Sequence, residues 1–172
     1  MKFPRIRGRN ADGDRVYLPV DFEGEPTLVL LTFQWQQRAV VRAWREFADS
    51  LAEEYDDFEY AELYVTGGKS GLHPPVMTGG LGPTPGSAAG DDRLLSVRVN
   101  KRSFRRSLGL PGESTVYALL VDDEYVVRQA AGMLTRDIAE GLQSLLAEWE
   151  DAEIRWTEAR ATRAEAESSA DE

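Results

Sequence analysis

The longest apolar stretch of the chain extends from Thr27 to Phe33 and consists almost entirely of aliphatic, β-branched and aromatic residues. A run of this kind is typical of a strand that is buried on both faces, inside a parallel or mixed sheet. Past Arg38 the large apolar residues recur at helical spacing instead, at Val40, Trp44, Phe47 and Leu51. The change of period predicts a strand, a loop and a one-faced helix of roughly three turns that ends near Glu54.

Three further short stretches are rich in apolar and β-branched residues and predict strands: Phe58 to Val65, Leu94 to Val99 and Val116 to Val121. The third is joined through three acidic residues to Tyr125–Gln129, which predicts a hairpin. Near the N-terminus, Phe3 to Arg7 and Arg15 to Leu18 flank an Asp-Gly turn and predict two short edge strands.

Two more helices are expected in the second half of the chain. Asn100 is a suitable N-cap for a helix that continues through Leu108, with Phe104 on its inner face and Gly109 closing it. Thr135 is a suitable cap for a final helix with an apolar stripe formed by Ile138, Leu142, Leu145, Leu146 and Trp149. From Thr157 onward no core residue remains, so we expect a solvated helical arm with a frayed end.

The domain organisation follows from length and composition. The 172 residues, 42% of them hydrophobic, suffice for one domain with a sizeable core. We expect a domain over residues 1–150 and an acidic helical extension with a disordered tail over residues 151–172. Residues 66–92 form a long insertion with eight Gly and four Pro. Such loops are functional or disordered, and a lid, a partner-binding segment and a plainly tolerated insertion all stay open.

Cysteine is absent from the chain. Its absence excludes disulfides, thiol catalysis and thiolate metal sites. The first residues contain no apolar export signal, and no later run approaches the length of a membrane span. We therefore expect a cytoplasmic protein without membrane insertion.

The formal net charge is -10, from 30 acidic residues and only 20 Lys and Arg. This balance disfavours nucleic-acid binding, which needs a basic footprint. It suits adaptation to high salt, although a GC-rich genome with an acidic tail explains it equally well. The charge is also unevenly placed, because Glu46 to Glu62 holds eight acids and no base, whereas Arg93 to Arg106 holds six bases and no acid.

The expected order of elements resembles that of the thioredoxin-like superfamily, and particular stretches are similar to its branch of peroxiredoxins and thiol-disulfide oxidoreductases. The lead-in to the central strand resembles that branch at Asp12-Gly13, Val16 to Leu18, Asp21-Phe22 and Gly24. The ending resembles it at Val116 to Asp122, Tyr125 to Arg128, Gly132 and Thr135. The resemblance implies an α/β fold, a thioredoxin-like three-layer sandwich in which helices flank a central mixed β-sheet.

Two departures from that branch concern its active site. Active relatives place a cysteine at a helix N-terminus shortly after the central strand, where the helix dipole stabilises the thiolate. Here that position falls between Gln36 and Arg42, which include no thiol. The branch's cis-proline precedes the third core strand, and the best match here is Ser114, with Pro111 displaced. The loss of both suggests a site that is no longer used for redox chemistry.

A second and fainter resemblance covers the stretch from Leu108 to Gly132. It is similar to the C-terminal part of the mitochondrial ATP-synthase assembly-factor family, which is also thioredoxin-like and lacks redox activity. This resemblance implies a binding role at most.

Two groups of residues are candidates for a binding surface. The first is a polar and aromatic surface at the end of the central strand, formed by Gln34, Trp35, Gln36, Gln37 and Ser114. The second is a basic surface formed by Arg98, Lys101, Arg102, Arg105 and Arg106, which suits an anionic partner. Instead of binding a partner, the first group could be a solvated loop, and the second could pair internally with acidic residues. We identify no catalytic residue, cofactor site or metal site, and His73 has no orienting partner in sequence.

Three hypotheses about function follow. The first is a redox-inactive thioredoxin-like domain that binds a protein partner and acts in assembly or as a chaperone-like module. The second is a peroxiredoxin-like or thiol-disulfide oxidoreductase enzyme that depends on a partner's thiol. The third is a structural homo-oligomer that self-associates through the C-terminal helix around Trp149, Ile154 and Trp156.

Overall fold

The structure, a computed structural model, describes the backbone of residues 1–67 and 93–169, and the side chains of that part as far as residue 152. The chain divides into two compact units, Met1–Met133 and Leu134–Glu172. The first unit contains the sheet, and the second consists mainly of α3 (Arg136–Ser169). Of the insertion predicted over residues 66–92, Thr66 and Gly67 belong to a strand, while residues 68–92 with His73 lie outside the described part.

Within the described residues, seven strands form one mixed sheet in the order β2-β1-β5-β4-β3-β6-β7. Their bounds are Ile6–Arg9 (β1), Arg15–Leu18 (β2), Thr27–Thr32 (β3), Glu59–Gly67 (β4), Leu94–Val99 (β5), Tyr117–Asp122 (β6) and Tyr125–Ala131 (β7). The inner strands β3, β4 and β5 are parallel, and the remaining neighbours pair antiparallel. The α/β class and the mixed sheet expected from the sequence are confirmed.

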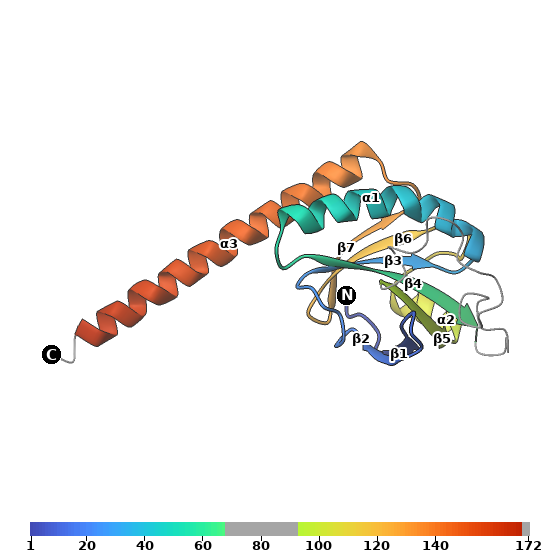
Figure 1. Cartoon of the computed structure of the whole chain (residues 1–172), viewed down its shortest axis with the longest axis horizontal. Coiled ribbons are helices and arrows are strands. Elements are labelled where there is room, and N and C mark those ends of the chain that lie inside the picture. Colours follow the sequence, from blue (N-terminus) through green and yellow to red (C-terminus); the bar gives the residue numbers. More distant parts are fainter. Residues whose placement is uncertain (68–92, 170–172) are drawn as a thin grey trace. The chain divides into compact units, whose positions relative to one another are not determined.

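Two helices of the first unit lie on opposite faces of this sheet (Figure 1). A 3-10 turn, η1 (Trp35–Gln37), leads from β3 into α1 (Arg38–Glu54), which connects β3 to the parallel strand β4. The short helix α2 (Lys101–Ser107) follows β5 and covers the other face. Since side chains alternate along a strand, Val29 and Leu31 of β3 join Phe104 of α2 in one core cluster, whereas Leu28 and Leu30 face the side of α1.

The predicted strand Thr27–Phe33 is confirmed as an interior strand, since all six residues of β3 are buried. The first predicted strand was placed too early, because it begins at Ile6 rather than Phe3. Phe3 belongs to the core, where it is 1% exposed and its ring lies 5.6 Å from that of Phe22. The prediction that this is an edge strand was also wrong, since β1 pairs with both β2 and β5. A side chain at Gly8 would collide with the β5 backbone, which explains the glycine.

Helix α1 begins and ends where the periodicity predicts, but its buried face is turned slightly. The buried residues are Val41, Trp44, Ala48 and Leu51, while Val40 and Phe47 are only half-buried. Its 17 residues make nearly five turns, rather than three. Trp44 is completely buried and its indole N–H donates to the carbonyl oxygen of Gly132 at 3.0 Å, so this helix is also tied to the end of β7.

Both predicted N-caps are present. The Asn100 Oδ1 atom accepts a hydrogen bond from the Ser103 N–H at 3.0 Å, and Gly109 ends α2 with a φ of +64°. The Thr135 hydroxyl accepts from the Ile138 N–H at 3.4 Å. The expected frayed end of α3 falls on residues 170–172, outside the described part. None of the described helices has the length and apolar character needed to cross a membrane.

Candidate functional site

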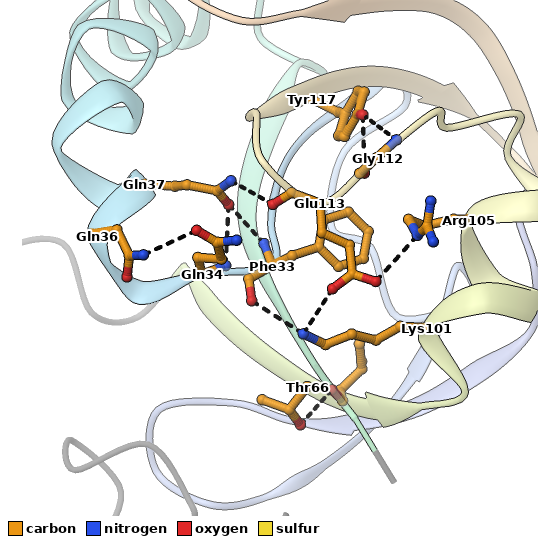
Figure 2. Close-up of polar contacts among 11 residues, drawn as sticks. Phe33, Gln34, Gln36, Gln37, Thr66, Lys101, Arg105, Gly112, Glu113 and Tyr117 are labelled. Atoms are coloured by element: carbon orange, nitrogen blue, oxygen red, sulfur yellow. Dashed lines mark hydrogen bonds and ion pairs between the residues drawn. The ribbon is translucent and has the colours of Figure 1, made fainter.

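The sequence placed the candidate site at the carboxyl end of β3, and the structure brings three segments together there. They are the β3–α1 connection, the loop before β6 and the first turn of α2, as Figure 2 shows. Carboxyl ends of parallel strands are common ligand sites in open α/β sheets. The residues at this end determine which chemistry is available.

Gln37 is the central residue of this arrangement. Its Oε1 atom accepts hydrogen bonds from the backbone N–H groups of Phe33 at 2.9 Å and Gln34 at 3.1 Å. Its Nε2 atom donates to the carbonyl oxygen of Glu113 at 2.7 Å (Figure 2). The residue is 7% exposed. One buried amide group therefore joins the connection after β3 to the loop before β6.

The loop before β6 is also held by Tyr117, the first residue of that strand. The phenol oxygen accepts from the Gly112 N–H at 3.1 Å and donates to the Gly112 carbonyl oxygen at 3.0 Å. Arg105 of α2 donates to the Pro111 carbonyl oxygen at 3.2 Å. Ser114, the residue matched to the cis-proline position, is exposed on this loop. The backbone of the loop is thus fixed at three points.

The Glu113 carboxylate connects this loop to α2. One oxygen lies 3.3 Å from Lys101 Nζ and the other 3.2 Å from Arg105 Nε. Lys101 Nζ also donates to the Phe33 carbonyl oxygen at 3.4 Å, so the lysine reaches the end of β3 (Figure 2). Two of the predicted basic residues therefore form internal ion pairs at the candidate site.

The remaining basic residues are distributed differently. Arg102 and Arg106 are exposed on α2 and have no ion-pair partner among the described residues. Arg98 is exposed on β5 between Val97 and Val99, which contact the core beneath α2. Because side chains alternate along a strand, Arg98 points to the opposite face. The structure therefore does not bring Arg98 together with the basic residues of α2.

Trp35 forms the aromatic part of the candidate site. The residue is 37% exposed, its ring meets that of Tyr64 edge-to-face at 5.7 Å, and the Arg38 guanidinium lies 4.5 Å from the centre of the ring. Beside it, the Gln36 amide donates to the Gln34 side-chain oxygen at 2.9 Å. These amide and aromatic groups supply hydrogen bonds and stacking surface, but no nucleophile or general base.

A buried charge cluster under α1 was missed by the sequence analysis. Glu62 of β4 is 3% exposed, and its carboxylate pairs with Arg45 and lies 3.7 Å from Arg38 Nη2. The available signal was an acid in the middle of a run of aliphatic and aromatic residues, Tyr60 to Val65. A buried carboxylate needs such partners, so this cluster ties α1 to β4. Since Arg38 also stacks on Trp35, the cluster positions the aromatic part of the site.

A second feature missed by the sequence analysis is a hollow of about 340 Å³ near the amino ends of β3 and β4. Its lining includes Asp21, Phe22, Glu59, Tyr60 and Arg93. The Arg93 guanidinium pairs with Glu59 and stacks on the Tyr60 ring at 4.3 Å. Burial and a hydrogen bond to Asp49 raise the pKa of Tyr60, which keeps the phenol protonated. Glu59 and Arg93 are thus paired with one another, and the Asp21 carboxylate accepts a hydrogen bond from the Tyr17 N–H at 2.7 Å, so we assign no reactive role to this hollow.

The described residues include no cluster of three or more His, Asp or Glu side chains that could hold a metal ion. The titratable groups described above at the carboxyl end of β3 belong to the Glu113 ion pairs, the Glu62 cluster and the phenols of Tyr64 and Tyr117. The described part of the candidate site thus offers hydrogen-bonding, charged and aromatic groups for binding contacts.

Comparisons with known proteins support the assignment of the fold. No protein-family model and no curated protein matches the chain. Among solved structures, copper-bound ScoI from Arabidopsis thaliana is similar, with a TM-score of 0.58 and 12% identity over 86% of this chain and 99% of that one. An exposed lipoprotein thioredoxin of Streptococcus pneumoniae has a TM-score of 0.50 and 18% identity over 84% and 99% of the two chains. A member of the Sco family of cytochrome c oxidase assembly proteins has a TM-score of 0.54 and 13% identity over 83% and 92%.

At these identities the similarity concerns the fold. The chain has a thioredoxin-like fold, as its sequence predicted, and it contains no cysteine. The resemblance of Leu108–Gly132 to the ATP-synthase assembly-factor family stays a prediction. So does the expected self-association through α3, for which the side chains of Ile154 and Trp156 lie outside the described part.

Proposed function

We propose that this chain is a redox-inactive thioredoxin-like domain that binds a protein partner, as an assembly or chaperone-like module. One observation carries the proposal. Within the stretch Gln36–Arg42, where the resemblance places a thiol, the chain has Gln37, whose amide oxygen accepts two backbone hydrogen bonds and whose amide nitrogen donates one to Glu113. This side chain holds two loops together and has no reactive group.

The chemistry of thiol exchange supports this reading of the site. Disulfide exchange and peroxide reduction both require a thiolate that attacks a sulfur or an oxygen atom. The chain contains no cysteine, and a neutral amide is not a nucleophile of this kind. Any redox turnover would therefore need a thiol from another molecule.

Binding is the function that the surrounding surface can support. Trp35 is partly exposed next to the amide groups of Gln34 and Gln36, and Arg102 and Arg106 are exposed on α2. Tryptophan and arginine are enriched among the residues that dominate the binding energy of protein interfaces. The surface around the end of β3 is therefore the one we assign to the partner.

The redox half of the proposal is tested with the purified chain. We expect its rates of insulin-disulfide reduction and of peroxide removal, in the presence of dithiothreitol, to equal those of buffer alone. Addition of a thioredoxin from another source provides the positive control. A rate above the buffer rate that is lost in Gln37→Ala would overturn the proposal.

The binding half is tested by affinity capture from an extract of the source organism. The wild-type bait is compared with the double variant Arg102→Glu and Arg106→Glu, which leaves the internally paired Lys101 and Arg105 in place. A matched control carries Arg15→Glu and Arg128→Glu, exposed residues on β2 and β7 that give the same change of net charge. We expect one defined partner on the wild type and the control, and its loss from the α2 variant.

A further inference from the structure

Helix α2 carries an unusual concentration of positive charge for an acidic protein. Four of its seven residues are basic, namely Lys101, Arg102, Arg105 and Arg106. Among the described residues, Glu113 is the acid that forms ion pairs with this helix. The chain as a whole carries a formal charge of -10. The surface of α2 is therefore a local positive patch within a negative field.

The four cations divide into an inner and an outer pair. The inner pair, Lys101 and Arg105, shares the carboxylate of Glu113, and their side chains are 27% and 23% exposed. The outer pair, Arg102 and Arg106, lies one helical turn apart on the exposed side and has no ion-pair partner in the described part of the chain. The patch thus has one internal carboxylate for four cations.

The contacts of that carboxylate are loose. Its distances to Lys101 Nζ and Arg105 Nε are 3.3 Å and 3.2 Å, longer than the typical range of about 2.7–2.9 Å for charge-assisted hydrogen bonds. The Arg105 Nε atom is buried and forms no hydrogen bond within the described residues, so its contact with Glu113 is an ion pair only. A carboxylate that lies closer to both side chains would form charge-assisted hydrogen bonds of typical length with Lys101 and Arg105.

A competing anion can also displace the Glu113 carboxylate from the two cations without disrupting the loop that carries it. The loop is fixed through backbone atoms, by the bond from Gln37 Nε2 to the Glu113 carbonyl oxygen and by the two bonds between Tyr117 and Gly112. None of these bonds involves the Glu113 carboxylate, which is 32% exposed. A competing anion can therefore reach the inner cations while the loop keeps its position.

We propose that α2 binds a short acidic segment of a protein partner, and that Glu113 occupies the inner half of this site in the free protein as an internal competitor. Carboxylates of the segment pair with Arg102 and Arg106, and a further carboxylate replaces Glu113 between Lys101 and Arg105. This inference rests on the proposed binding function and names its partner chemistry. A short segment is favoured over a long polyanion because the net charge of -10 repels anions that extend beyond the patch.

The test is a binding titration by fluorescence anisotropy with the full chain. The probes are a labelled peptide of alternating Glu and Ser, the matched peptide of alternating Gln and Ser, and a single-stranded oligonucleotide of the same charge as the acidic peptide. We expect the acidic peptide to bind at low salt and the Gln peptide not to bind. Affinity should fall about ten-fold in the variant Arg102→Gln with Arg106→Gln, and should be unchanged in the control Arg15→Gln with Arg128→Gln.

The decisive variant is Glu113→Gln. Removal of the competing carboxylate should tighten the acidic peptide about five-fold, the equivalent of one partly exposed ion pair. Unchanged or weaker binding would show that Glu113 does not compete. If Glu113→Gln does not fold, as judged by circular dichroism, Glu113→Asp supplies the same comparison, since its shorter side chain retracts from the two cations.

Other results would overturn the inference in identifiable ways. Equal binding of both peptides would refute recognition of carboxylates, and an oligonucleotide that binds as tightly as the acidic peptide would refute a peptide-specific site. In either case the proposed function is judged separately, because capture of a partner and the lack of redox turnover do not depend on these probes. Loss of that partner on Arg102→Glu with Arg106→Glu, without acidic-peptide binding, would keep the binding function and reject its anionic chemistry.

Discussion

At the scale of single residues, Gln37 shows why an amide suits its position better than an acid or a shorter side chain. The side chain must accept from two backbone N–H groups and donate to a carbonyl oxygen at the same time. A carboxylate can accept but not donate, so Glu would place a negative oxygen against the Glu113 carbonyl. A buried polar group that loses its partner costs more than the bond contributes.

We therefore predict that Gln37→Ala lowers the free energy of unfolding by about 2–3 kcal/mol, because the Phe33 N–H and the Glu113 carbonyl lose a partner in a buried setting. Gln37→Glu should destabilise by a similar amount, although it keeps the acceptor. The measurement is urea denaturation followed by tryptophan fluorescence. The neighbouring Gln36 is exposed, so Gln36→Ala should change stability by less than about 0.5 kcal/mol. Equal effects of the two alanine variants would contradict the role of Gln37.

The same residues show how far sequence can locate a site. Gln37 falls within the stretch Gln36–Arg42 where the resemblance places a thiol, and the lack of cysteine was evident from composition. The bond from Gln37 to Glu113 spans 76 positions, and no local pattern encodes a partner so distant. The orientation of Arg98 was missed for another reason. Its charge suggested a common patch with α2, while the alternation of side chains along β5 turns it to the other face.

At the scale of elements, α2 depends on its cap more than the longer helices do. A helix of seven residues is too short to be stable by propensity, so its first turn needs the bond from the Ser103 N–H to Asn100. Asn100→Ala should destabilise the protein by about 1 kcal/mol, whereas Asn100→Asp, which keeps the acceptor, should lose little. The two variants are compared by thermal unfolding. If both lose the same stability, the cap is not what holds the first turn.

The N-terminal segment supplies a prediction about pH. Phe3 N–H donates to the Glu124 carbonyl at 2.8 Å, and Val126 N–H donates to the Met1 carbonyl at 2.7 Å, so the segment lies against the β6–β7 hairpin. Hydrogen bonds from Lys2 and then Arg5 hold the pKa of Glu124 below its ordinary value of 4.5. Because the pKa of Glu124 is lower in the folded state, its ionised carboxylate stabilises the folded protein. This stabilisation is complete above the unfolded pKa and is lost as the pH falls through the folded pKa.

We expect the amides of Phe3 and Val126 to lose protection against hydrogen exchange below pH 4.5, relative to core amides such as that of Leu120. The variant Glu124→Gln should show the lower protection already at neutral pH and no further change on acidification. NMR-detected exchange, corrected for intrinsic rates, measures both. A pH response that persists in Glu124→Gln would assign the effect to another group.

The elements also show which parts of the fold a sequence reveals. The bounds of α1 and β3 followed from the change between apolar run and helical period, because each buries a continuous face. The start of β1 did not follow from the apolar pattern, because Phe3 is buried without being part of a strand. Its ring fills the core beside Phe22 and Phe104 before the strand begins. Apolar character marks burial, and burial coincides with a strand only where the backbone also pairs.

At the scale of the molecule, charge is the dominant property. The formal charge of -10 produces mutual repulsion in the folded state, while ion pairs such as Arg42–Glu46 and Arg136–Glu140 are largely exposed. Exposed pairs contribute about 0–1 kcal/mol each to stability. Salt weakens both the repulsion between the acidic residues and the attraction within these pairs. Because acidic residues exceed basic ones by ten, we expect repulsion to outweigh the exposed pairs.

This balance predicts that salt stabilises the protein. Between about 0.1 M and about 1 M NaCl the Debye length falls from about 10 Å to about 3 Å, and the Tm should rise by about 5 °C. Glu53 and Glu54 contribute directly, because they are exposed acids at the carboxyl end of α1, which has no basic residue in its last turn. They repel one another and the negative end of the helix dipole.

The variant Glu53→Gln with Glu54→Gln should therefore be more stable than the wild type at low salt, by about 1 kcal/mol, and should gain less from added NaCl. The matched control is Asp12→Asn with Asp14→Asn, which removes the same charge from an exposed or half-exposed turn away from any helix end. Differential scanning calorimetry of the wild type, the variant and the control at both salt concentrations measures the Tm values that this comparison needs. A Tm that falls with salt would mean that the ion pairs, rather than the excess of acids, set the electrostatic stability of this fold.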